Sequence, residues 1–322
     1  MIATHAHVAG DPPVIELRHL RRAFGSTQAV DDVSFTVPRG AVFGYIGPNG
    51  AGKTTSMRIL STLEIPDSGD AMVDGLSSVN DPDKVRRRLG FMPDAFGSYS
   101  ATSCIEYLDF YARAHGLDGP DRTRQLRRVI DFTGLAEMAD KPMNGLSKGM
   151  RQRLGLGRAL VHDPSVLILD EPAAGLDPRA RIELREMIGQ LSSEGKTVLI
   201  SSHILTELAE MCDHVGIIER GRLLAVGSVN DIRQVSTRRT LRIATRDDDA
   251  ARRAEPILNG FGAVDDVVVD GRLIRGSFTG DAESQIELLK TLIVGDVPVA
   301  AYEVDETSLE DAFLRITQGR IQ

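Results

Sequence analysis

The sequence contains very little cysteine, no long apolar run and no excess of basic residues. Its two cysteines, Cys104 and Cys212, are too few for a disulfide framework or a multi-cysteine metal cluster, and they fit a reducing compartment. No stretch approaches about 18 consecutive apolar residues, so we expect no membrane-spanning helix. The 38 lysines and arginines against 46 aspartates and glutamates give a net charge of −8, which argues against wholesale binding of nucleic acid.

The length and composition indicate a globular protein of two domains. The chain has 322 residues, which is about twice the length of a typical domain. Its 42% apolar and 26% charged residues are ordinary for a globular chain that can bury a sizeable core. Residues 1–13 have no basic region followed by an apolar core, so we interpret them as a disordered leader and not as a secretory signal.

Strand and helix patterns alternate between residues 14 and 228. The strands expected at 165–170, 197–201 and 215–219 are apolar throughout, as in a parallel sheet covered by helices. From about 95 to 162 the pattern is mostly helical, and Ser103 with Glu106 forms a capping box before an apolar periodic run. We therefore predict an α/β domain with a helical subdomain.

A second pattern starts after Gly227 and has the β-α-β-β-α-β order of a ferredoxin-like domain. Its expected elements are a strand at 240–245, a helix at 250–258, a hairpin at 264–278 that turns at Asp270 and Gly271, a helix at 283–293 and a strand at 299–304. Thr307 and Glu310 would cap a last helix, and 228–238 is the expected linker. We interpret 238–322 as a small α+β accessory or regulatory domain, because it carries no catalytic cluster, although a fold alone does not define a role.

A glycine-rich stretch, GPNGAGKTT, matches G-x-x-x-x-G-K-[ST] between an apolar strand and a helix. In this pattern backbone N–H groups and the helix N-terminus surround phosphate oxygens. Lys53 is expected to reach the β- and γ-phosphates, and Thr54 to place its hydroxyl on Mg²⁺. The stretch predicts a nucleoside triphosphate site made of Gly47, Pro48, Asn49, Gly50, Ala51, Gly52, Lys53, Thr54 and Thr55.

Two adjacent carboxylates end the buried strand VLILDE at 166–171. Neighbouring residues of a strand point to opposite sides, so one carboxylate can hold Mg²⁺ while the other faces the attacking water. We assign Asp170 to the metal and Glu171 to the water as general base. The alternative is a strand end followed by a solvated acidic turn.

These motifs, in this order, resemble the ATP-binding subunits of ABC transporters over residues 14 to about 228. The further elements of the resemblance are LSKGMRQRL at 146–154, which is similar to the LSGGQ signature, EPAAGLDP at 171–178, which leads into the D-loop, VLISSH at 198–203, which ends in the switch histidine, and LGFMPD at 89–94, at the place of the Q-loop. The C-terminal addition most resembles the branch of single-domain subunits associated with drug resistance and small-molecule export.

The resemblance implies a P-loop ABC-type ATPase core that binds ATP and Mg²⁺, and it implies roles for residues outside the glycine-rich stretch. Phe24 would stack on adenine, the alternative being a core phenylalanine. His203 would contact the γ-phosphate and hold Glu171, and Asp177 would organise a dimer interface. The signature residues would bind the ATP held by a second copy, with Ser147 capping their helix; they are Ser147, Lys148, Gly149 and Met150.

Three positions depart from the family pattern. Asp94 replaces the Q-loop glutamine and is expected either to act at the metal or in coupling, or to cap the next segment. Lys148 replaces a glycine and Met150 a glutamine, and Lys148 either reaches the opposing γ-phosphate or projects to solvent. Because Ser147 and Gly149 are kept, we expect these changes to affect the rate and not the class of reaction.

One phosphate site and one signature make two half-sites, which implies a homodimer with ATP between its copies. The resemblance therefore predicts an ATP-hydrolysing subunit, cytoplasmic and bound to the inner face of the membrane through a separate permease, with export favoured over import. The permease would enter a groove near Tyr99, Tyr107 and Phe110, the last two also being core candidates. The basic runs at 86–88 and 122–128 are either solvated faces or partner contacts.

Two alternatives stay open. The first is a soluble ABC-type ATPase without a role in transport, although such proteins usually carry two phosphate sites or long coiled-coil insertions. The second is a regulatory subunit that binds ATP without hydrolysing it. The presence of Glu171 and His203 speaks against the second alternative.

Overall fold

The computed structural model describes residues 12–95, 97, 99, 102–205, 208, 210–235 and 239–305. The chain divides into two compact units, Met1–Val229 and Asn230–Gln322, and each has a buried apolar core of its own. Most of the leader expected at 1–13 and the helix expected after Thr307 lie outside the described residues. Within the described part of the chain, no helix is both long and apolar enough to cross a bilayer.

A six-stranded sheet with the order β10-β9-β3-β8-β7-β6 forms the centre of the first unit. Its strands are β3 (Val42–Ile46), β6 (Leu89–Met92), β7 (Val166–Leu169), β8 (Thr197–Ser202), β9 (His214–Glu219) and β10 (Arg222–Ser228). All neighbours are parallel except β9 and the edge strand β10, which are antiparallel. Strands β3, β7 and β8 are buried at every position, which explains their continuous apolar sequences and confirms the predicted parallel sheet.

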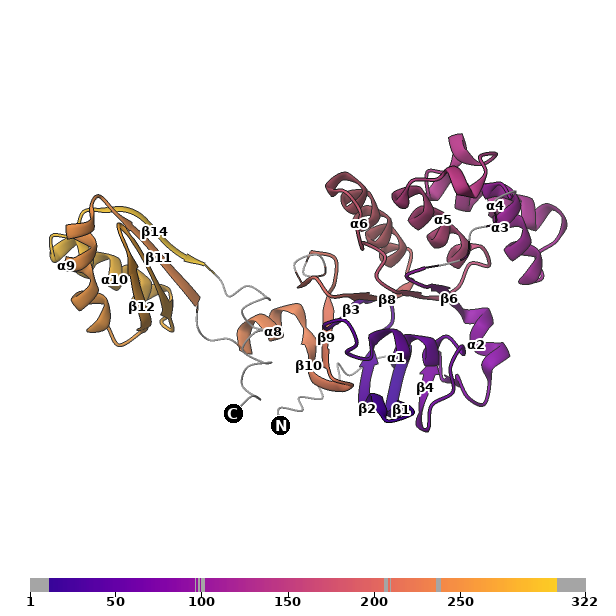
Figure 1. The fold of residues 1–322 in the computed structure, drawn as a ribbon, viewed down its shortest axis with the longest axis horizontal. Helices are drawn as coiled ribbons and strands as arrows, with labels where there is room; N and C mark the ends of the chain where they lie inside the picture. Colours follow the sequence, from indigo (N-terminus) through magenta and orange to yellow (C-terminus); the bar gives the residue numbers. More distant parts are fainter. Residues whose placement is uncertain are drawn as a thin grey trace. The chain divides into compact units, whose positions relative to one another are not determined.

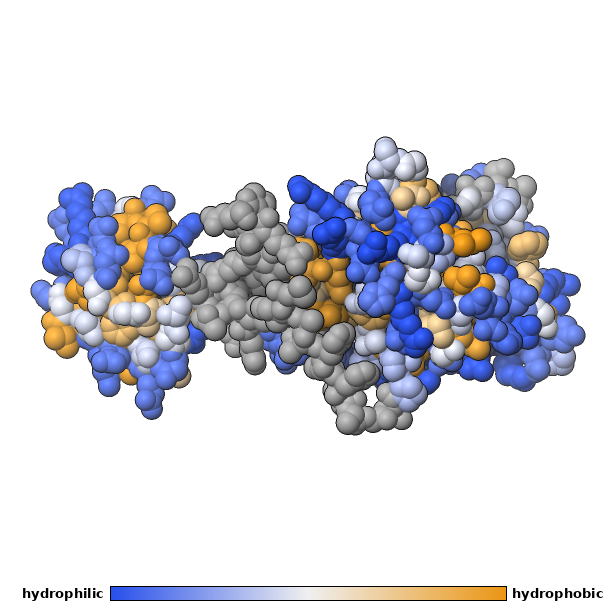
Figure 2. All heavy atoms as spheres, turned by 90° about the horizontal axis from the view of Figure 1, so that it is seen from below, coloured by the Kyte–Doolittle hydropathy of each residue, from blue (hydrophilic) through white to orange (hydrophobic). Residues whose placement is uncertain are grey.

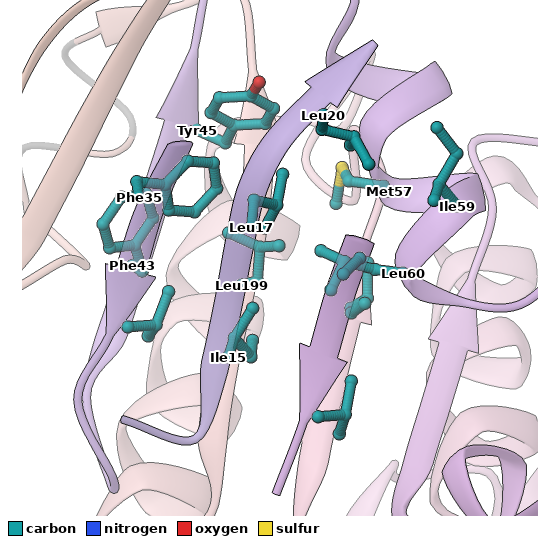
Figure 3. Packing of buried hydrophobic residues seen from close by; sticks show 14 of the residues in the cluster. Ile15, Leu17, Leu20, Phe35, Phe43, Tyr45, Met57, Ile59, Leu60 and Leu199 are labelled. Carbon is teal, nitrogen blue, oxygen red and sulfur yellow. The ribbon is translucent and has the colours of Figure 1, made fainter. Parts of the chain in front are cut away.

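A second, antiparallel sheet packs beside the first and has the order β2-β1-β4-β5. Its strands are β1 (Ile15–Phe24), β2 (Thr27–Val37), β4 (Ser68–Val73) and β5 (Leu76–Ser77), and the helices nearby are α1 (Lys53–Leu60) and α2 (Pro82–Arg88). Figure 3 shows apolar side chains of β1, α1 and both sheets meeting in one core. The rings of Phe35 and Phe43 stack there with centroids 5.1 Å apart. This core fixes α1, and with it the glycine-rich stretch, against β3.

The helical subdomain contains α3 (Cys104–Ala114), α4 (Gly119–Phe132), α5 (Lys148–Leu160) and two short 3-10 turns, Ala136–Met138 and Met143–Gly145 (Figure 1). The predicted capping box is confirmed: Glu106 N donates to Ser103 Oγ, and the Glu106 carboxylate accepts from Ser103 N at 2.8 Å. Tyr107 is buried as expected, but the expectation that Phe110 is a core residue is wrong, because it is 63% exposed. Phe110 lies about 200° around the helix from the buried Leu108.

The second unit is a four-stranded antiparallel sheet with two helices, and its strand order β12-β13-β11-β14 confirms the ferredoxin-like prediction. Its elements are β11 (Arg239–Thr245), α9 (Asp248–Asn259), β12 (Val264–Asp270), β13 (Leu273–Phe278), α10 (Ala282–Val294) and β14 (Val299–Asp305). Leu241 and Ile243, on one face of β11, share a core with residues of both helices. The segment expected to be a linker, 228–238, contains a short helix, α8 (Val229–Val235).

The face of the molecule seen in Figure 2 is mostly polar. Hydrophilic residues cover most of the face seen in Figure 2, and apolar residues appear there in smaller patches. The basic runs follow this pattern, because Arg86 pairs with Asp83 at 2.7 Å and Arg122 pairs with Asp109 at 2.8 Å. These ion pairs favour the interpretation of the basic runs as solvated faces beside acidic neighbours.

Candidate functional site

The glycine-rich stretch joins β3 to α1 and forms a tight cradle of backbone. A Cβ atom at Gly47 would overlap the carbonyl oxygen of Ile218, and one at Gly52, whose φ is +105°, would overlap that of Ala29. The described structure gives α1 no side-chain cap and no acidic residue in its first turn. A glycine turn of this kind before an uncapped helix N-terminus suits an anion such as a phosphate.

Lys53, the first residue of α1, is almost completely buried beside the cradle. Its Nζ donates to the carbonyl oxygens of Gly47 at 2.6 Å and Pro48 at 3.3 Å, and it lies 3.3 Å from Glu171 Oε1. The side chain is only 6% exposed. A buried ammonium needs such partners, so Glu171 provides its counter-charge.

Glu171 links the cradle to the end of β8. Its Oε2 lies 2.8 Å from His203 Nδ1, while its Oε1 faces Lys53. The residue is not a glycine, yet its φ is +49°, in the left-handed region, which is uncommon and directs the side chain out of the strand line. Glu171 thus contacts both Lys53 and His203. The three residues come from α1, from the loop after β7 and from the position directly after β8.

Asp170 is the buried acid of the pair. It is 1% exposed, it accepts a hydrogen bond from Ser201 Oγ at 2.6 Å, and it shares another with Thr54. Burial raises the pKa of the Asp170 carboxyl, and the neighbouring charges of Glu171 and Asp94 raise it further. A carboxylate in such surroundings gains from a cation beside it, because the cation offsets both the burial and the like charges.

The three residues expected at the metal line one cleft of about 750 Å³; they are Thr54, Asp94 and Asp170. Their hydroxyl and carboxylate oxygens are the ligand type that Mg²⁺ prefers. Among the described residues there is no group of three or more His, Cys, Asp or Glu able to hold a metal. One hydroxyl and two carboxylates leave part of a six-coordinate shell to water and phosphate oxygens, which fits the coordination of Mg²⁺.

Ser201 is a site residue that the sequence analysis missed. It is completely buried in β8, it donates to Asp170 Oδ1, and its Oγ accepts from Glu171 N at 2.9 Å. It therefore fixes both carboxylate residues at once. The available signal was a serine directly after the apolar run VLI of the strand TVLISS, where a buried polar side chain needs a partner.

Phe24 ends β1 and is 47% exposed, so the alternative of a core phenylalanine is wrong. It faces Thr27 in the hairpin with β2, and β2 continues to Ala29, whose carbonyl oxygen abuts Gly52 of the cradle. The guanidinium of Arg22 covers the ring, with Cζ 4.7 Å from the centroid. An exposed aromatic ring connected to the cradle in this way is suited to stacking on a base.

The signature segment begins α5, and Ser147 caps that helix as predicted, accepting from Met150 N at 3.3 Å. Lys148 lies over Gly175, where a Cβ would collide with its ammonium group, so its side chain contacts the loop that follows Glu171. The same loop ends at Asp177, whose Oδ1 accepts from Ala180 N at 2.9 Å and caps α6 (Pro178–Ser193).

Comparisons with known proteins agree with these motifs. A family model described as ABC transporter matches residues 30–174. The chain is 31% identical over 309 residues to the daunorubicin/doxorubicin resistance ATP-binding protein DrrA of Streptomyces peucetius, covering 94% of this chain and 92% of that protein. It is 37% identical over 231 residues to the probable multidrug ABC transporter ATP-binding protein YbhF of Escherichia coli (strain K12), covering 71% of this chain but 40% of that protein.

Solved structures give the same picture of the fold. The structure of an ATP binding subunit of an ABC transporter matches with a TM-score of 0.63 and 31% identity, covering 69% of this chain and 92% of that chain. The ADP conformation of MJ1267, an ATP-binding cassette of an ABC transporter, matches with a TM-score of 0.61 at 22% identity, covering 69% of this chain and 95% of that chain. At that identity the second likeness concerns the fold alone.

Proposed function

The chain belongs to the family of ABC transporter ATP-binding proteins, and we propose that it hydrolyses ATP to power a separate membrane permease that exports a small molecule. The observation that carries the proposal is the contact of Glu171 with both Lys53 and His203 at the phosphate cradle. Relatives named for drug resistance and for Nod factor export favour an exporter. The proposed location is the inner face of the membrane, through the permease.

Each site residue has a separate task in this proposal. Lys53 exchanges its carbonyl partners for the β- and γ-phosphates, and Phe24 stacks on adenine. Glu171 accepts the proton of the attacking water, while His203 holds the carboxylate in place. Mg²⁺, when bound, neutralises phosphate charge. Thr54 and Asp170 would hold that ion, with Asp94 beside them.

A second copy of the chain completes the site. The cradle supplies one side of the bound ATP, and the signature of the partner copy supplies the other through Ser147, Lys148, Gly149 and Met150. The N-terminus of α5 faces the γ-phosphate in this arrangement, and Asp177 lies at the interface between copies. ATP therefore joins two copies and its hydrolysis separates them.

Replacement of the general base tests the proposal. We expect Glu171→Gln to keep ATP binding, to lose at least about 10²-fold in hydrolysis and to collect as an ATP-bound dimer, because the amide cannot accept the proton. Turnover and the mass in solution with and without MgATP are the measurements. Glu186→Gln, at an exposed position of α6, is the matched control. A hydrolysis rate unaffected by Glu171→Gln contradicts the assignment of the base.

The partner requires a separate experiment. The tagged chain, recovered from gently solubilised membranes of its host, should carry a stoichiometric protein with several membrane spans. Recovery from the soluble fraction alone, with the ATPase activity intact, contradicts the transport part of the proposal and leaves the hydrolysis part standing.

A further inference from the structure

The ring of Phe24 rests on a charged network whose members have no role in the site described so far. Arg22 and Phe24 are two positions apart on β1, so their side chains lie on the same face of the strand. The Arg22 guanidinium lies over the ring, with Cζ 4.7 Å from its centroid. One face of the ring is therefore in contact with Arg22, while the side chain as a whole keeps about half of its exposure.

Two acids from the connection between α1 and β4 hold the guanidinium in this position. Arg22 Nη1 donates to Asp67 Oδ1 and Nη2 donates to Glu64 Oε1, both at 2.7 Å. The side chains of Arg22 and Glu64 are 25% and 19% exposed, so this pair is partly shielded from water, whereas Asp67 is 46% exposed. A planar guanidinium bound through both terminal nitrogens has little freedom to rotate away from the ring.

Asp67 also fixes the backbone on both sides of Arg22. Its N donates to the carbonyl oxygen of Arg21 at 2.9 Å, and its Oδ2 accepts from Ala23 N at 2.6 Å. The Ala23 N–H and the Arg22 guanidinium lower the pKa of the Asp67 carboxyl. One residue of the connection therefore holds the main chain directly before Phe24 and the cation beneath its ring.

We propose that Arg22, clamped by Glu64 and Asp67, is the positioning residue that presents the free face of the Phe24 ring to the nucleobase. The inference rests on the proposed function, in which Phe24 stacks on adenine. A ring already held in one orientation loses less freedom when a base binds, which strengthens binding without any new contact to the ligand. The cation also polarises the ring from one side, so the base stacks on the other.

The proposed role of Arg22 concerns the nucleobase and not the phosphates. A ligand with phosphates but no base therefore distinguishes this role from a general effect on the site. Equilibrium binding of MgATP and of magnesium tripolyphosphate is measured on the full chain. We expect Arg22→Met to weaken MgATP by about two- to fivefold and to leave tripolyphosphate unchanged. Arg18→Met is the matched control, because Arg18 lies on the same strand and pairs with Glu16 in an exposed position.

Phe24→Ala distinguishes the stacking of Phe24 on the base from the positioning of Phe24 by Arg22. It should weaken the binding of MgATP and not that of tripolyphosphate. Adding Arg22→Met to Phe24→Ala should cause no further loss of affinity, because both residues act through one ring. A loss with Phe24→Ala but none with Arg22→Met overturns the role of Arg22. No loss with Phe24→Ala overturns the stacking itself and the inference with it.

A parallel loss of both ligands with Arg22→Met also overturns the inference, since it shows a structural or long-range electrostatic role. Thermal unfolding of each variant is measured alongside. If Arg22→Met does not fold, Arg22→Lys gives the same comparison, because lysine keeps the charge but lacks the planar fork. A loss of affinity for MgATP but not for tripolyphosphate in Arg22→Lys then supports the inference. Equal affinity for MgATP in Arg22→Lys and in the unaltered chain contradicts it.

Discussion

His162 shows how one residue can make the stability of this chain depend on pH. Its ring stacks on that of His115 with centroids 3.7 Å apart, and its Nε2 lies 3.2 Å from the carbonyl oxygen of Leu89. Burial lowers the pKa of His162 from 6.5 to about 4, and positive charge on His115 and Lys196 acts in the same direction. The hydrogen bond to the Leu89 carbonyl oxygen and the charge of Asp163 partly oppose this shift. Both imidazoles line the cleft that holds the expected metal ligands.

The sign of the pH effect follows from this lowered pKa. Between about pH 6.5 and about pH 4 the unfolded chain binds a proton at His162 and the folded chain does not, so stability falls as the pH falls. The full loss is at most about 3 kcal/mol. We expect His162→Phe to reduce the difference in unfolding free energy between about pH 7 and about pH 5, measured with urea.

At the scale of the element, two helical glycines allow the effect of helix propensity on stability to be distinguished from the effect of packing. Gly189 lies in α6 with nothing within 4 Å of the place of a Cβ, whereas a Cβ on Gly157 in α5 would lie 3.1 Å from Val129 Cγ1. We therefore expect Gly189→Ala to stabilise the chain by about 0.5–1 kcal/mol. Gly157→Ala should give no such gain, because Val129 and Leu108 must move. Equal shifts in urea unfolding for both variants would contradict this explanation.

The regular elements were predictable because their signals are local. Strand β7 falls within the expected 165–170, and the capping box at Ser103 is the one expected. The orientation of Phe110 was not predictable, because it depends on which face of α3 meets its neighbours. The short helix α8 within the expected linker at 228–238 is likewise a result that local composition did not signal.

For the candidate site, the residues that local motifs identify were predictable, and those that depend on contacts between distant segments were not. Lys53, Asp170 and Glu171 each belong to a motif within one short segment, and an ammonium or a carboxylate in such a motif indicates a specific chemical role. The clamp of Arg22 by Glu64 and Asp67 was not predictable, because it joins residues 42 and 45 positions apart whose types are ordinary at a surface. Ser201 was missed for a similar reason, since its partners follow another strand, β7.

At the scale of the whole molecule, two cores predict two unfolding steps. Phe278 is completely buried in the core of the second unit. We expect Phe278→Ala to destabilise that unit by about 3–5 kcal/mol and to lower one calorimetric transition, while the transition that MgATP stabilises stays in place. Val268→Ala, at a residue 61% exposed in the same unit, should change neither by more than about 0.5 kcal/mol. A joint shift of both transitions would show that the chain unfolds as one body.

The contacts of Lys53 have a consequence for the free energy of folding. A buried ammonium without partners would favour unfolding. Lys53 Nζ donates to the carbonyl oxygens of Gly47 and Pro48 and lies 3.3 Å from Glu171 Oε1, so the fold itself supplies the partners of this charge. The free-energy cost of burying Lys53 is therefore offset during folding by residues of the same chain.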